Sequence, residues 1–108
     1  MNPYETQVLA EKLARRLGVI TPIIRLGSRC HFNGNAHCHI QTTNHYRRGT
    51  ICINPNKFLR MDSTKQRILI IHEVSHLKPR KNHTHNNRTY TKAYKELMVG
   101  EFPLAVRA

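Results

Sequence analysis

Residues 68–77 read ILIIHEVSHL, an almost wholly apolar run that carries two histidines and one glutamate among branched aliphatic side chains. Before this run, Asp62 or Ser63 can cap a helix, and Gln66 stands three residues after Ser63, as in a capping box. After the run, Pro79 disfavours helical backbone at the residue before it. We therefore expect a helix that is buried on most sides and ends near Pro79.

The polar residues of this run have the spacing of a zinc site. His72 and His76 are four positions apart, so a helix stacks them on one face, close enough to bind one metal ion. Glu73 falls beside that face, where it can deprotonate a metal-bound water. A histidine-rich chain produces such a pattern by chance more easily than most. However, burying these groups unpaired would cost several kcal/mol each, and a metal is a strong partner.

A catalytic zinc also needs a third protein ligand and one open position for water. The polar loop after His76 offers His83 and His85, and Glu96 follows further along the chain. Either histidine is near enough in sequence to reach the metal from the loop. If the two histidines bind no metal, they simply belong to an exposed polar loop. If Glu96 binds no metal, it lies on a solvent-exposed face of a helix beside lysines.

The segment before residue 19 predicts a helix. Asn2 can cap it, Pro3 suits the first helical position, Glu5 stands three residues after the cap, and Gly18 supplies a stop. One face of this helix is apolar and is expected to pack in the core. It carries Leu9, Leu13 and Leu17.

Three strands are expected next. Branched residues fill 20–29, and Asn33-Gly34-Asn35 is a strong hairpin signal. Apolar and polar residues alternate over 36–41, and 50–54 supplies the third strand. A closing helix is predicted from about 89 to 99. Its apolar face carries Tyr90, Ala93, Tyr94 and Leu97, and Gly100 is its expected stop. The predicted class is therefore α+β, as one domain over residues 1–108, with an N-terminal helix, a three-stranded sheet of the antiparallel type, a His-Glu-x-x-His helix and a closing helix.

Composition limits the partners. The net charge of +12 attracts polyanions, so nucleic acid is a candidate partner, although the basic residues are spread along the chain. No apolar run is long enough to span a membrane, and the N-terminal segment lacks the apolar stretch of a signal peptide. We therefore expect a cytoplasmic protein. The odd number of cysteines, three, argues against a disulfide framework.

Other metal-competent residues gather around the expected hairpin turn. They are Cys30, His31, His37, Cys38 and His39. Because side chains alternate along a strand, Cys38 faces away from His37 and His39, so one four-ligand site is awkward to build. The paired Cys-x-x-Cys spacing of a zinc finger is also missing. The expected arrangement is surface histidines, with Cys38 and Cys52 at small buried core positions.

The order of elements resembles that of the SprT-like zinc metalloproteases and the related small WLM-type zincins. In these families the catalytic helix carries HExxH, and the third ligand is a histidine that precedes an aromatic residue opening the last helix. The matching residues here are His72, Glu73 and His76, followed by His85 and Tyr90. The resemblance covers about residues 9 to 97, and its specific part runs from 72 to 94.

The resemblance implies His85 as the third ligand, with two departures. The spacing from His85 to Tyr90 is one residue longer than usual, and Asn86 stands where a glycine is common. His83 and then Glu96 therefore stay as alternatives.

Together the motif and the resemblance predict a zinc-dependent endopeptidase that acts on a protein or peptide substrate. His72, His76 and His85 would hold Zn²⁺, and Glu73 would take a proton from water and pass it to the leaving amine. The strand at 50–54 is a candidate to pair with an extended substrate. SprT-like proteins often act on DNA-associated proteins, which agrees with the basic charge. The alternative is a non-catalytic zinc- or nucleic-acid-binding module.

Overall fold

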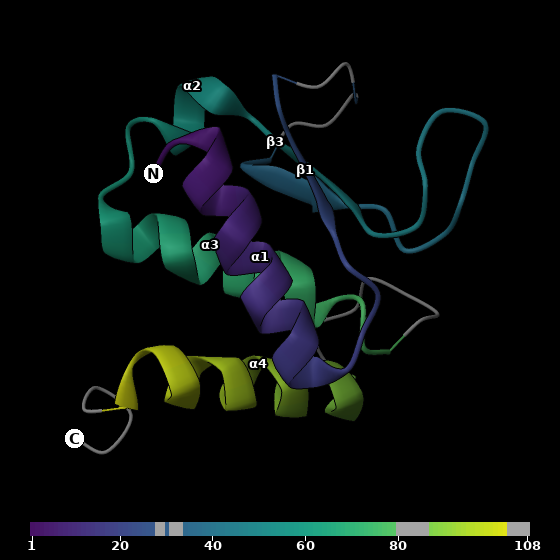
Figure 1. The fold of residues 1–108 in the computed structure, drawn as a ribbon, viewed down its shortest axis with the longest axis vertical. Coiled ribbons are helices and arrows are strands. Elements are labelled where there is room, and N and C mark those ends of the chain that lie inside the picture. The colour runs from purple at the N-terminus through teal and green to yellow at the C-terminus, as the bar shows by residue number, and fades with distance from the viewer. Residues whose placement is uncertain (28–29, 31–33, 80–86, 104–108) are drawn as a thin grey trace.

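The computed structural model describes residues 1–27, 30, 34–79 and 87–103 (Figure 1). Within these ranges the predicted α+β class is confirmed, with helices packed against a small sheet. In chain order the elements are α1 (Pro3–Leu17), β1 (Ile23–Leu26), β2 (Ala36–Cys38), β3 (Thr50–Ile53), α2 (Pro55–Phe58), α3 (Ser63–Ser75) and α4 (Arg88–Glu101). The short helix α2 had not been predicted.

Helix α1 begins and ends as its local sequence predicts. The Asn2 side chain accepts a hydrogen bond of 2.7 Å from the Glu5 backbone N–H. In return the Glu5 carboxylate accepts one of 3.1 Å from the Asn2 N–H, which completes a capping box. Gly18 ends the helix with a φ of 69°, a left-handed conformation that glycine adopts without steric cost.

The sheet is mixed, so the expectation of an antiparallel sheet is wrong for one of its strands. The strand order is β1-β3-β2, with β1 parallel and β2 antiparallel to β3. The two strands on either side of the expected hairpin turn therefore do not pair with each other, and Asn33 of that turn lies outside the described residues. The physical reason is burial. All four residues of β3 are buried, so this strand takes the central position, where neighbours cover it on both sides.

Helix α3 lies at the centre of the molecule. It packs against α1, α4 and β2, as Figure 1 shows for the helices. Ile70, Ile71 and Val74 are fully buried, which confirms the expectation of a helix buried on most sides. Each such side chain contributes roughly 1.5–3 kcal/mol through the apolar surface that it removes from water. The His-Glu-x-x-His residues therefore belong to a helix that is fixed by packing against two other helices and a strand.

The ends of α3 differ in detail from the prediction. Asp62 caps the helix by accepting a hydrogen bond of 2.9 Å from the Lys65 N–H. Gln66 does not complete a capping box; its side chain donates to the Phe58 carbonyl at 2.9 Å. The helix ends at Ser75, and turns continue towards Pro79. His76 is therefore the C-cap residue, with a φ of −64° that still resembles helical backbone.

Helix α4 runs further than its glycine signal predicted. It begins after Asn87, whose side chain accepts from the Thr89 N–H at 2.8 Å, and continues through Gly100 to Glu101. Gly100 is thus an interior residue and not the helix stop. A Cβ there would meet the guanidinium of Arg16 on α1, the flexible end of a side chain that packs over this glycine.

Candidate metal centre

Two imidazole nitrogens lie together where α3 ends. The Nε2 atoms of His72 and His76 are 3.3 Å apart. Two nitrogens bound to one tetrahedral zinc at ~2.0–2.1 Å would lie about 3.3–3.4 Å from each other. The two rings therefore already have the separation of a bidentate zinc site, and they fit the metal that the motif implies.

Tyr90, the third residue of α4, holds His72 in place. Its hydroxyl oxygen is 2.7 Å from His72 Nδ1, and its ring packs against that of His76 with centroids 4.6 Å apart. When His72 carries its proton on Nδ1 and donates it to Tyr90, the Nε2 lone pair is left for a metal. Burial raises the pKa of Tyr90, so the hydroxyl stays neutral. The sequence had placed Tyr90 on the apolar face of its helix and as the aromatic residue that opens it, without predicting its contact with His72.

Glu73 lies beside the histidine pair in a nearly dry environment. It is 4% exposed, and its carboxylate approaches His72 Nε2 at 3.9 Å. Burial raises the pKa of Glu73 from the ordinary 4.5 to about 7, and a hydrogen bond from the Cys38 backbone N–H offsets part of this rise. A carboxylate whose pKa lies near neutrality is suited to accept a proton and then release it.

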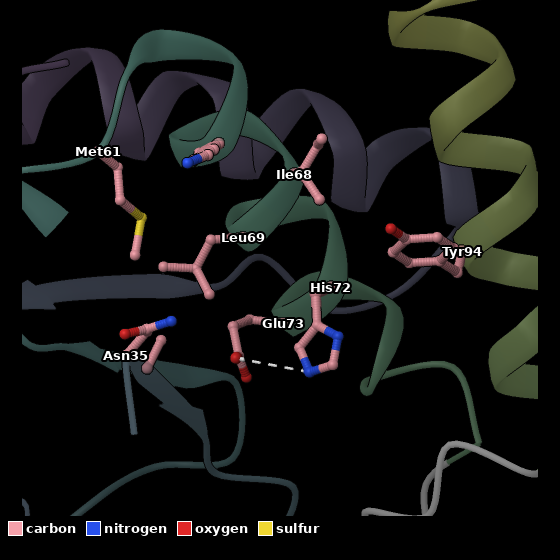
Figure 2. A pocket seen from close by; sticks show the side chains of 9 residues that line it. Asn35, Met61, Ile68, Leu69, His72, Glu73 and Tyr94 are labelled. Carbon is pink, nitrogen blue, oxygen red and sulfur yellow. Dashed lines mark ion pairs between the residues drawn. The ribbon is translucent and has the colours of Figure 1, made fainter. Parts of the chain in front are cut away.

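A pocket of about 460 Å³ opens in front of these groups (Figure 2). Its size is within the range of small-ligand and substrate sites. His72 and Glu73 form one wall, and the start of β2 forms the opposite one. The remaining lining is mostly apolar: Met61, Ile68, Leu69 and Tyr94, with Lys65.

The position of β2 corrects the expectation about substrate pairing. Residues 50–54 cannot receive a substrate strand along β3, because β3 is already paired on both sides. The strand at the pocket is β2, an edge of the described sheet, and Ala36 and Asn35 line the pocket. The Cys38 N–H also points away from β3, since it donates to Glu73. The edge that can extend the sheet therefore faces the Glu73 carboxylate.

Two of the three candidates for the third ligand belong to the loop predicted after Pro79. His83 and His85 both lie outside the described residues. Glu96 is described; it is exposed on α4 and lines a different hollow, together with Lys78, Arg88 and Lys92. Within the described part of the chain, the group of potential ligands around α3 consists of His72, Glu73 and His76. Glu96 is not a member of it.

A second group of potential ligands, Cys30, His37 and His39, lies on the face of the sheet that points away from the core. Ile51 and Ile53 belong to the core, so Cys52 between them points to the opposite face, although it is fully buried. The prediction that Cys52 occupies a small buried position is confirmed, although it lies outside the main hydrophobic cluster. Cys38 does belong to that cluster, as expected.

Comparison of the chain with family models, with curated proteins and with solved structures found no match. The geometry of the site therefore carries the functional interpretation by itself.

The basic residues line separate hollows. Lys78, Arg88 and Lys92 line one at the start of α4, and Arg25 and Arg47 line another beside β1. Nucleic acid stays a predicted partner. No helix in the described ranges is long and apolar enough to cross a membrane.

Proposed function

We propose that this protein is a zinc-dependent metallopeptidase of the SprT-like or WLM type. The observation that carries the proposal is the 3.3 Å separation of His72 Nε2 and His76 Nε2, beside a buried Glu73 that faces a pocket. Two imidazoles at metal-binding separation, with an adjacent carboxylate to act as general base, are the core of a hydrolytic zinc site. His85 is the proposed third ligand, with His83 and then Glu96 as alternatives.

Each residue has a defined part in the reaction. The bound zinc would supply Lewis acidity toward a water molecule and the scissile carbonyl. Glu73 accepts the proton of the attacking water and delivers it to the leaving amine, a transfer that its dry surroundings favour. Tyr90 keeps His72 in the tautomer that presents Nε2 to the metal.

The substrate is proposed to be an extended polypeptide. It would add to the β2 edge beside Ala36, so that its backbone hydrogen-bonds to the sheet while one side chain enters the pocket. Met61 and Leu69 line that pocket, which favours an apolar side chain at this position. DNA-associated proteins are candidate substrates because the chain carries a net charge of +12.

Replacing Glu73 by Gln tests this function. The zinc-loaded variant should retain its metal, because both histidines remain, but cleave an unfolded protein substrate at least about 10²-fold more slowly. Glu11→Gln on α1 is the matched control and should cleave normally. Cleavage by Glu73→Gln at the rate of the unmodified chain would contradict the proposal.

A non-catalytic zinc module is the second candidate, and the Cys and His group on the outer face of the sheet favours it. In that case the chain would bind zinc, and neither it nor any variant would cleave a substrate.

A further inference from the structure

A cluster of two thiols and two imidazoles lies on the face of the sheet opposite the helices. Cys30 Sγ is 3.3 Å from His39 Nε2, and Cys52 Sγ is 3.4 Å from the same nitrogen. A hydrogen bond also joins the two thiols. The ligand atoms of Cys30, His37 and His39 all lie within 4.8 Å of one another. One imidazole nitrogen therefore lies beside both sulfur atoms, with a second imidazole close by.

The register of the sheet brings these residues together from distant parts of the chain. His37 on β2 lies directly opposite Cys52 on β3, and His39 follows two residues later on the same face. Cys30 arrives from the segment between β1 and β2. The His39 ring is held in place by stacking on Tyr46, with centroids 4.3 Å apart. The fourth residue, Cys52, could not be recognised from local spacing, because it is 13 residues from His39.

The two sulfur–nitrogen separations at His39 are close to those of a tetrahedral metal site, and Cys52 joins the close group of Cys30, His37 and His39 through His39. With Zn–S near 2.3 Å and Zn–N near 2.0–2.1 Å, a sulfur and a nitrogen on one zinc are separated by about 3.5–3.6 Å. The separations from His39 to the two sulfurs are within a few tenths of an ångström of this value. Cys52 is fully buried, as is usual for a ligand of a closed structural site.

We propose that Cys30, His37, His39 and Cys52 bind a second, structural zinc ion. Binding replaces the two thiol protons with Zn–S bonds and releases those protons to solvent, with no change of oxidation state. Four protein ligands leave no open position for water, so this site is not catalytic. It connects Cys30 to two neighbouring strands of a sheet whose strands are only three or four residues long. The metal therefore supports a small sheet on the face that the helices do not cover.

Zinc content in a variant without the first site tests the proposal. His72→Ala combined with His76→Ala should leave one tightly bound zinc per chain, where the unmodified chain holds two. Adding Cys30→Ser should remove the remaining zinc. Adding Cys38→Ala instead should leave it in place, because Cys38 points into the core on the other side of the sheet. Loss of all zinc in the double histidine variant would overturn the proposal.

Cobalt substitution provides a readout that does not depend on folding of the cysteine variants. Only the second site has thiolate ligands, so the unmodified chain loaded with Co²⁺ should show thiolate-to-cobalt charge-transfer absorption. The double histidine variant should show the same absorption. A spectrum without this band, or recovery of a Cys30–Cys52 disulfide from protein purified without oxidant, would overturn the second site. Neither result bears on the histidine site, which contains no sulfur.

Discussion

At the scale of the residue, the site depends on how the ring of His72 is oriented. The hydroxyl of Tyr90 contacts one ring nitrogen of His72 at 2.7 Å, and the other ring nitrogen faces His76 at 3.3 Å. An outer partner of this kind commonly fixes the tautomer of a metal ligand. Tyr90 of α4 is therefore the residue that orients the His72 ring of α3.

We predict that Tyr90→Phe weakens zinc binding at this site by about 10–100-fold, because the ring packing remains while the hydroxyl partner of His72 is lost. Competition with a chromophoric chelator measures the affinity, in a Cys30→Ser background that removes the proposed second site. Tyr94→Phe, which changes the α4 tyrosine that lines the pocket, should bind zinc as the parent does. Equal affinities for the two tyrosine variants would show that the hydroxyl contact has no role.

At the scale of the element, two ion pairs hold α4 against the other helices. Glu101 at the end of α4 contacts Lys12 of α1 at 2.9 Å and Arg67 of α3 at 2.8 Å, and its side chain is 2% exposed. Burial alone would raise the pKa of Glu101, but the hydrogen bonds and charges of Lys12 and Arg67 outweigh it and lower the pKa.

Glu101→Gln should lower the free energy of unfolding by about 1 kcal/mol, since the buried carboxylate loses the charge that pairs it with the partly exposed Lys12 and Arg67. A lowered carboxyl pKa stabilises the fold above the ordinary value of 4.5, and this contribution is lost as the pH falls through the lowered value. The difference between the two proteins should therefore shrink in acid. Urea unfolding at several pH values measures it, with exposed Glu96→Gln as the control. An unchanged unfolding free energy at neutral pH would refute this role.

The elements also show which features local sequence can predict. The caps of α1 were predicted correctly because Asn2, Glu5 and Gly18 act through neighbours a few residues away. The expectation of an antiparallel sheet was wrong for β1, which pairs in parallel with β3, because pairing is decided by burial across the whole chain and β3 has the most buried residues.

The same distinction applies to the two candidate sites. His72 and Glu73 lie in α3 and His76 is its C-cap, so their spacing was enough to predict their meeting. Cys52 joins His39 only through the sheet register, so spacing could not predict that contact.

At the scale of the whole molecule, the charge of +12 predicts an electrostatic attraction to nucleic acid. We expect the affinity for double-stranded DNA to fall steeply as salt rises, because each phosphate contact releases condensed counterions. Some of the basic residues line two separate hollows, so we expect the DNA affinity to be shared among several lysines and arginines. Fluorescence anisotropy over a salt series measures this, and a flat dependence would remove DNA as a partner.

The central claim is that one zinc ion binds to His72 and His76 beside Glu73 and keeps a position open for water. Anomalous diffraction at the zinc edge from crystals of the zinc-loaded protein tests it most directly. We predict a zinc peak about 2.0–2.1 Å from both Nε2 atoms, with one further protein ligand and a water near the Glu73 carboxylate. A zinc peak that is absent from the two histidines, or a site closed by four protein ligands, would contradict the claim.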